Sequence, residues 1–174
     1  MPMKLREFSV PILPTGARDI RILHFSDLHL TPRRKREIAE IRSWHELNPD
    51  LVISTGDFLA HKDAVNTALF ALDPLLDLPG LFVFGSNDYY GPMLKNPFSY
   101  LTPDDGSRKL GKPLPSDELD IRLQGRGWIN LNHSKQIITV SGVAIEVRGT
   151  DDAHLRLDDY SKVAGKKAKS CDIS

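Results

Sequence analysis

The chain has 174 residues, of which 40% are hydrophobic and 26% charged, so its composition is that of an ordinary soluble globular protein and its length predicts one domain over residues 1–174. Lys plus Arg and Asp plus Glu both number 23, which argues against a general polyanion binder, and no specific nucleic-acid partner is expected. The single cysteine, Cys171, excludes an internal disulfide framework and a cysteine zinc cluster. No long apolar run and no apolar segment typical of a signal peptide occurs, which predicts no transmembrane segment and a cytoplasmic protein.

The first half of the chain is predicted to alternate strands with helices. Apolar runs bounded by turn residues predict strands at 7–13, 20–25, 51–55 and 81–84, the first at a sheet edge because of its prolines. Apolar residues at helical spacing predict helices at 33–47 and 63–76. Strands that alternate with helices at short intervals are typical of βαβ units, so we expect an α/β fold with a parallel sheet.

The pattern changes after residue 90. Five prolines fall between residues 91 and 116 and predict a long Pro-rich loop, a kind of segment that is more often functional or mobile than neutral. A short helix is expected from Ser116 to about Gly125, followed by strands at 128–131, 135–140 and 143–148. Ser141-Gly142 is the predicted hairpin turn between the last two strands. The expected architecture is therefore an α/β sandwich of βαβαβ units followed by a β-hairpin.

Residues that can ligate a metal follow three of the predicted parallel strands. They are Asp27 and His29 after the first, Gly56-Asp57 after the second, and Gly85-Ser86-Asn87-Asp88 after the third. Each motif alone is more often a turn or a helix cap. The carboxyl ends of adjacent parallel strands converge on one crevice, however, and mixed carboxylate, imidazole and amide ligands suit Mn, Fe, Zn or Mg. The joint placement therefore predicts a metal site, to which the two glycines would allow a close approach of the backbone.

The three motifs resemble those of the calcineurin-like metallophosphoesterases, which run Asp-x-His, then Gly-Asp, then Gly-Asn-His-Asp/Glu, each after a parallel strand. The chain is similar to a bacterial branch of predicted phosphohydrolases in its third motif, which continues into Tyr89-Tyr90, and in Lys95-Asn96-Pro97. The Gly-Thr-Asp-Asp-Ala-His segment at 149–154 also resembles that branch. The resemblance extends over nearly the whole chain from about Val10.

The resemblance implies a metal-dependent phosphoesterase that hydrolyses phosphomonoesters or phosphodiesters with a hydroxide activated by two divalent metal ions (Mn, Fe, Zn or Mg). It implies that Asp57 bridges the two ions, that Asp27 and His29 complete one side, and that Asn87 binds the second ion. A phosphorylated small molecule or lipid is the implied substrate.

The third motif departs from the family pattern. Aligned without a gap, Ser86 falls on the metal-binding Asn of the family, whereas a shift by one residue keeps Asn87 as the ligand; an amide oxygen is the better ligand. In either alignment the family histidine that protonates the leaving group is absent, and Asp88 could replace it only if its pKa were raised. Asn87 and Asp88 are thus the catalytic candidates, and His154 and Tyr89 are candidates for substrate binding.

The later family motifs, a His after another strand and a Gly-His-x-His, have no counterpart here. We therefore expect the first part of a larger metallophosphoesterase domain, which binds metal weakly and hydrolyses little. The alternative is a truncated or catalytically inactive α/β binding module. Of the other histidines, His24 is expected in the core and His133 in an exposed turn, while the basic run 33–36 is expected to be a solvated helix start that could also attract an anionic substrate.

Overall fold

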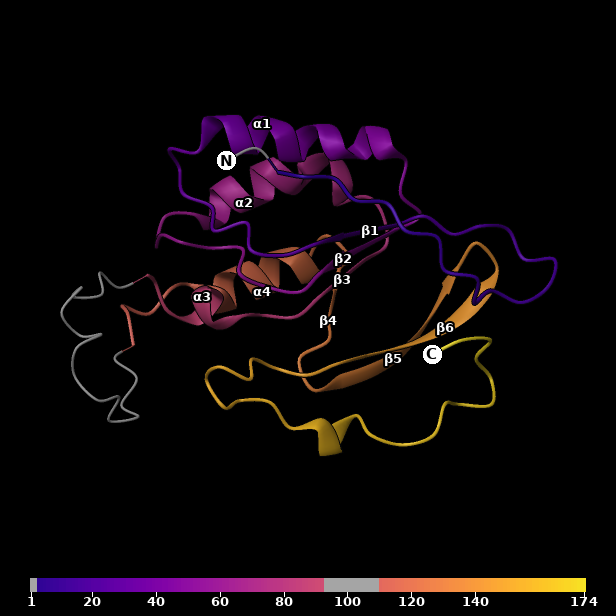
Figure 1. The fold of residues 1–174 in the computed structure, drawn as a ribbon. Helices are drawn as coiled ribbons and strands as arrows, with labels where there is room; N and C mark the ends of the chain where they lie inside the picture. Colours follow the sequence, from indigo (N-terminus) through magenta and orange to yellow (C-terminus); the bar gives the residue numbers. More distant parts are fainter. Residues whose placement is uncertain (1–2, 93–109) are drawn as a thin grey trace, which may run out of the picture.

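The computed structural model describes residues 3–92 and 110–174, so most of the predicted Pro-rich loop, over 93–109, lies outside the described residues. A parallel sheet forms the centre of the fold (Figure 1). Its strands, in spatial order, are β1 (Ile22–Phe25), β2 (Leu51–Ser54), β3 (Gly80–Phe82) and β4 (Ile129–Asn130). The strand order follows the chain order, as expected for successive βαβ units.

Helices cover one face of this sheet. They are α1 (Lys35–Ser43), α2 (Val65–Leu72) and α4 (Ser116–Gln124), with 3₁₀ turns extending α1 over Trp44–Leu47 and α2 over Asp73–Leu75. The one-turn helix α3 (Ser86–Tyr89) follows β3 directly. Side chains such as Val52 and Phe82 pack against the helices, while their strand neighbours Leu51 and Leu81 belong to a second core on the opposite face. Burial on both faces explains why the central strands read as continuous apolar runs.

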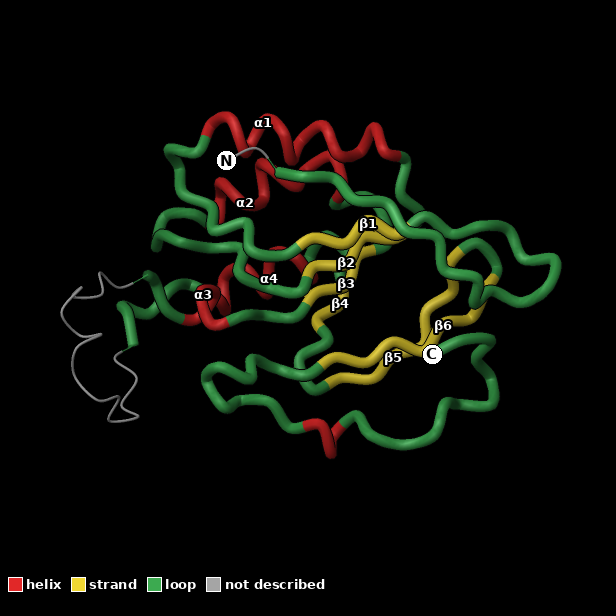
Figure 2. The backbone as a smooth tube through the Cα atoms, in the orientation of Figure 1, coloured by secondary structure: helices red, strands yellow, loops and turns green. Residues whose placement is uncertain are grey.

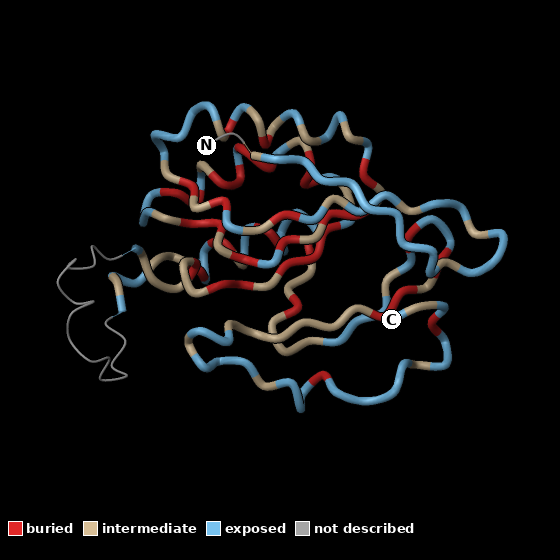
Figure 3. The backbone as a smooth tube through the Cα atoms, in the orientation of Figure 1, coloured by how far each residue is buried: buried red, intermediate tan, exposed pale blue. Residues whose placement is uncertain are grey.

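An antiparallel hairpin of β5 (Ser134–Val140) and β6 (Val143–Gly149) forms the third layer. Ser141 and Gly142 both have positive φ, 51° and 83°, as a two-residue type I′ turn requires. Val140, Val143 and Ile145 pack on the second core, and Figure 3 shows the buried backbone running through the central sheet. The α/β sandwich with a parallel sheet and a hairpin is thus confirmed.

The prediction of a strand at 7–13 is wrong. This segment has no regular structure, and its alternating apolar side chains Phe8, Val10 and Ile12 are exposed. Pro11 and Pro14 have no N–H to donate to a neighbouring strand, so alternation alone could not place the segment in a sheet.

His24 is exposed, contrary to the core position expected for it. The face of β1 that carries Ile22 and His24 lies on the hairpin side of the sheet, and the residues that pack there come from β2, β3, β4, the hairpin and nearby loops rather than from β1. His24 instead places Nε2 3.0 Å from Thr55 Oγ1. Within residues 3–92 and 110–174, no helix is long and apolar enough to cross a membrane.

Candidate metal site

The loops that follow β1, β2 and β3 meet at one edge of the sheet, on the left in Figure 2. There the side chains of Asp27, His29 and Asp57 converge, each offering a ligand atom within 4.8 Å of the other two. His29 Nε2 lies 3.6 Å from Asp27 Oδ1 and 3.7 Å from Asp57 Oδ2. Among the described residues, no other three His, Cys, Asp or Glu side chains form such a group.

Backbone hydrogen bonds join the first two of these loops. The N–H of Asp27 donates to Gly56 O at 3.1 Å, that of His29 to Asp57 O at 2.9 Å, and that of Leu30 to Phe58 O at 2.8 Å. The parallel pairing therefore continues beyond the ends of β1 and β2, through residues that carry the candidate ligands. This explains how two motifs about 30 residues apart in sequence reach one position.

The three converging residues share an unusual backbone conformation. Asp27, His29 and Asp57 have φ values of 59°, 43° and 60°, in the left-handed region that non-glycine residues seldom adopt. Asp and His tolerate this region better than most side chains, but it still costs free energy and is concentrated at functional sites. The backbone at this edge is thus held in a strained conformation that displays three side chains together.

Asn87, on α3, joins the group through Asp57. Its backbone N–H donates to Asp57 Oδ1 at 2.9 Å, and its side-chain Nδ2 donates to Asp57 Oδ2 at 2.8 Å. A half-turn of the amide exchanges its nitrogen and oxygen, so the same position can present an acceptor to a cation. Of the two alternatives for the third motif, Asn87 is the residue whose side chain contacts Asp57.

Asp88 is buried, with no exposed surface. Its Oδ2 accepts the N–H groups of Asp57 at 2.7 Å and Gly85 at 3.0 Å, and its Oδ1 accepts those of Phe58 at 2.8 Å and Leu59 at 3.1 Å. Burial raises its pKa to about 7, against the opposing effect of the backbone donors. The expected role as a proton donor to the leaving group therefore does not suit Asp88, because both its oxygens are engaged and neither is accessible to a substrate.

Glycines allow the loops to approach so closely. A Cβ atom on Gly85 would lie 2.2 Å from Asp57 Oδ1, and one on Gly56 would lie 2.4 Å from the nitrogen of Gly85. The sequence predicted that these glycines bring the backbone close to metal ions. In the structure they bring the loops after β2 and β3 close to each other and to the carboxylate of Asp57.

The family model of the calcineurin-like phosphoesterases matches residues 20–169, a span that includes all three motifs. The chain belongs to the calcineurin-like phosphoesterase family. A comparison with curated proteins finds no match. Membership confirms the resemblance at the level of this family and accounts for the metal-ligand residue types at three successive strand ends.

The donor set of this calcineurin-like phosphoesterase fits a divalent cation. Two carboxylates, one imidazole and one amide surround a single position, a mixture that suits Mn, Fe, Zn or Mg. A second ion could use the carboxylate oxygen of Asp57 that does not bind the first ion, together with the amide oxygen of Asn87. In the described part of the chain, there is no second group of three His, Cys, Asp or Glu side chains that could hold a metal ion.

Tyr89 was predicted to contact substrate, but its hydroxyl is engaged within the protein. It donates to Asp151 at 2.8 Å and accepts from Asn132 Nδ2 at 2.9 Å, while Asn132 Oδ1 accepts the N–H of Phe84. Burial and then Asp151 raise the pKa of Tyr89 above its ordinary value, so the hydroxyl stays protonated. Asn132 follows β4, the fourth parallel strand, and that position is the signal that could have identified it from sequence.

The remaining candidate histidines lie outside the group around Asp57. The side chain of His154 is 77% exposed, with Nδ1 3.6 Å from Asp152 Oδ2. His133 is half-buried, not simply exposed as expected, and its Nε2 accepts the N–H of Asp159 at 2.9 Å.

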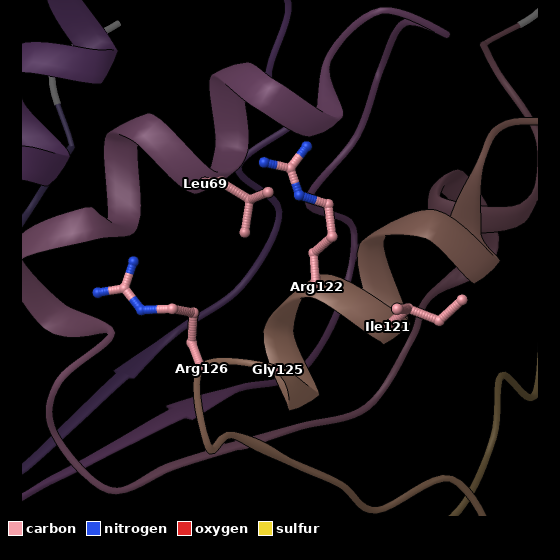
Figure 4. A pocket seen from close by; sticks show the side chains of 5 residues that line it. All are labelled: Leu69, Ile121, Arg122, Gly125 and Arg126. Carbon is pink, nitrogen blue, oxygen red and sulfur yellow. The ribbon is translucent and has the colours of Figure 1, made fainter.

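A separate hollow lies between α2 and α4, and Figure 4 shows the side chains of Leu69, Ile121, Arg122 and Arg126 around it. It has a volume of about 360 Å³ and contains none of the candidate ligands. Arg126 pairs with Asp73 at 3.1 Å and Asp77 at 2.9 Å, and Arg122 with Glu118 at 3.4 Å. Both arginines that line the hollow are thus paired with carboxylates.

Proposed function

We propose that this chain is a metal-dependent phosphoesterase that hydrolyses phosphomonoesters or phosphodiesters, with Asp27, His29, Asp57 and Asn87 as metal ligands. The observation that carries the proposal is the convergence of Asp27, His29 and Asp57, whose ligand atoms lie within 4.8 Å of one another, at the strand ends of a calcineurin-like phosphoesterase. By the family pattern, Asp57 would bridge two ions. The substrate would be a phosphorylated small molecule or lipid.

The protein's own groups hold the site in place. The paired loops after β1 and β2 fix Asp27 and His29 against Asp57, and α3 fixes Asn87 against the same carboxylate. A divalent ion held there would supply a Lewis acid that lowers the pKa of water and neutralises charge on the phosphoryl oxygens.

The leaving group receives little help from the described side chains. Asp88 is inaccessible, and His154 lies outside the group of candidate ligands. Without a general acid, an ester whose leaving group is already acidic reacts most readily. We therefore expect hydrolysis of aryl phosphate esters to exceed that of alkyl phosphate esters.

The test combines metal binding with hydrolysis. We expect Mn²⁺ to bind the chain and to support slow hydrolysis of bis(p-nitrophenyl) phosphate, and Asp57→Asn to lose both. Asp19→Asn is the matched control, because Asp19 is an exposed carboxylate just before β1, at the opposite end of that strand. If wild type binds no Mn²⁺, or if Asp57→Asn binds it as wild type does, the proposal is wrong.

An inactive α/β binding module is the second candidate. It is favoured by the small donor set, because the described residues provide well for one ion and poorly for two. Binding of Mn²⁺ by wild type with no metal-dependent hydrolysis of the aryl diester would select this alternative over the enzyme.

A further inference from the structure

Four consecutive cations, Arg33, Arg34, Lys35 and Arg36, lie between the loop of His29 and the body of α1; we call them the basic cluster. All four are exposed in a chain whose formal net charge is +0. Glu37 and Glu40 stand four residues after Arg33 and Arg36, the spacing at which helical ion pairs form. Within the described ranges, no ion pair involves any member of the basic cluster.

The position of the basic cluster is unfavourable for α1 itself. The N-terminal end of a helix carries a partial positive charge and favours acidic side chains. The helix α4 follows this rule, with Asp117 and Glu118 in its first turn and Arg122 in its last. At α1, Arg34 occupies the cap position and Lys35 and Arg36 begin the first turn, where Glu37 is the one acidic residue. Cations that gain nothing from this helix end and have no ion-pair partner among the described residues are available to an anion from outside the fold.

The basic cluster is held beside the candidate metal site. Leu30 pairs with Leu59 as an isolated parallel bridge, and the N–H of Ala60 donates to Leu30 O at 3.0 Å, which fixes the chain just after His29. Arg33 follows His29 by four residues, so their backbones are at most about 14 Å apart. The turn in which the N–H of Arg34 donates to Thr31 O shortens this reach. Figure 1 shows α1 beginning at the end of the molecule where β1, β2 and β3 finish.

We propose that the substrate carries a second phosphate group close to the phosphoester that is cleaved, and that the basic cluster binds this second phosphate. The inference rests on the proposed function and names the substrate class of the same site. Three of the four cations are arginines, whose planar guanidinium groups bind phosphate through paired hydrogen bonds. Cations with no partner in the described protein can make such bonds without first breaking an ion pair.

The test measures binding of inorganic tripolyphosphate by calorimetry in the presence of EDTA, so that the basic cluster is assayed without metal. The double variant Arg33→Gln/Arg34→Gln is compared with Lys166→Gln/Lys169→Gln. The second pair removes the same charge from two exposed lysines of the segment after β6. We expect the first variant to bind about tenfold more weakly, as the loss of two exposed charge contacts predicts, and the second to bind within about twofold of wild type.

Three outcomes would overturn the inference. They are wild-type affinity in Arg33→Gln/Arg34→Gln, an equal loss in both variants, and binding that depends on the basic cluster only with phosphatidylglycerol vesicles and not with tripolyphosphate. The last result would assign these residues to a membrane surface. Because the assay contains no metal, its failure is distinct from failure of the proposed function, which would show as absent Mn²⁺ binding.

Discussion

The carboxylate of Asp88 holds the backbone of Asp57 from inside the protein, with Asp88 Oδ2 accepting the Asp57 N–H at 2.7 Å. The same carboxylate accepts the N–H groups of Phe58 and Leu59, so three successive amides after β2 point at one buried side chain. In its left-handed conformation Asp57 turns its amide to Asp88 and its carboxylate to Asn87 and His29. Asp88 of the third motif therefore positions Asp57 of the second motif, although the Asp88 side chain is itself buried behind the candidate metal site.

Asp88→Asn should destabilise the fold. An amide offers one acceptor oxygen where the carboxylate offers two, so two of the four backbone N–H groups would lose their partner. We expect the free energy of unfolding to fall by about 3 kcal/mol, measured by urea denaturation followed by tryptophan fluorescence. Asp19→Asn, at an exposed carboxylate, should stay within about 0.5 kcal/mol of wild type. Equal stability of the two variants would contradict the role assigned to Asp88.

Gly85→Ala should weaken Mn²⁺ binding. The added methyl group would lie 2.2 Å from Asp57 Oδ1, so the carboxylate must move. Loss of a group that orients a ligand typically weakens metal affinity by about 10- to 100-fold, and we expect a change in that range by titration calorimetry. Gly91→Ala is the control, because its nearest neighbour would be at an ordinary 3.5 Å. Unchanged affinity in Gly85→Ala would show that the position of Asp57 is not critical.

Tyr89→Phe should loosen the loop after β6. The Tyr89 hydroxyl joins α3 to Asp151, and Asp152 Oδ1 accepts the N–H of Leu155 within the loop that Asp151 begins. We expect faster hydrogen exchange at residues 151–155 and a loss of about 1.5 kcal/mol in unfolding free energy, as for a hydrogen bond to a charged group. Tyr160→Phe, at an exposed tyrosine, should change neither. Unaltered exchange in Tyr89→Phe would mean that the loop is held by other contacts.

Glu146 should make the free energy of unfolding depend on pH in the acidic range. Its side chain is 2% exposed, Arg148 donates to it through Nε at 2.7 Å, and Ala168 donates its N–H at 2.9 Å. The Arg148 hydrogen bond holds the pKa of Glu146 below its ordinary 4.5. The stabilisation is therefore present above pH 4.5 and lost as the pH falls through the folded-state pKa.

The predicted role of Glu146 is tested by comparing the thermal unfolding of wild type and Glu146→Gln at neutral and acidic pH. The variant should be less stable than wild type at neutral pH and should lose less stability on acidification. Glu118→Gln, which removes an exposed helical pair with Arg122, should keep the wild-type pH dependence. A pH dependence in Glu146→Gln as steep as that of wild type would contradict the prediction.

Asp27→Asn should separate metal binding from folding. Its side chain is 66% exposed and lies beside the carboxylate of Asp57, so neutralising it costs the metal-free fold little. Mn²⁺ at ten times its dissociation constant stabilises wild type by about 1.4 kcal/mol, a shift of roughly 3–5 °C in Tm that EDTA reverses. Asp27→Asn should have the wild-type Tm without metal and a smaller shift with it. An equal shift in both proteins would exclude Asp27 as a ligand.

The sequence predicted the strands of the central sheet well because they are buried on both faces, and buried strands read as apolar runs whatever surrounds them. The residues that converge at the strand ends could also be predicted. Residues that follow adjacent parallel strands all lie at the carboxyl end of the sheet, so their motifs had to meet there. The segment at 7–13 had the alternation of a strand, but its backbone could not pair. That failure comes from prolines, which affect hydrogen bonding without altering hydrophobic pattern.

Contacts between distant residues could not be predicted. Tyr89 reaches Asp151 across 62 residues, and Asp88 binds amides about 30 residues earlier. A motif indicates that a carboxylate is present, but not whether it faces solvent or the backbone of another loop. The proton-donor role was expected for Asp88 only if its pKa were raised; burial does raise it, but the sequence could not show that both oxygens accept backbone N–H groups.

The positive φ angles of Asp27, His29 and Asp57 have a consequence for how this protein tolerates change. Glycine would fit each of these positions better than the residue present, because it adopts positive φ without steric cost. Replacing a candidate ligand by glycine would thus remove the steric cost of its positive φ. The same replacement inside a regular strand would destabilise that strand. At this edge of the sheet, the side chains of the candidate metal site are therefore kept at some cost to the stability of the backbone.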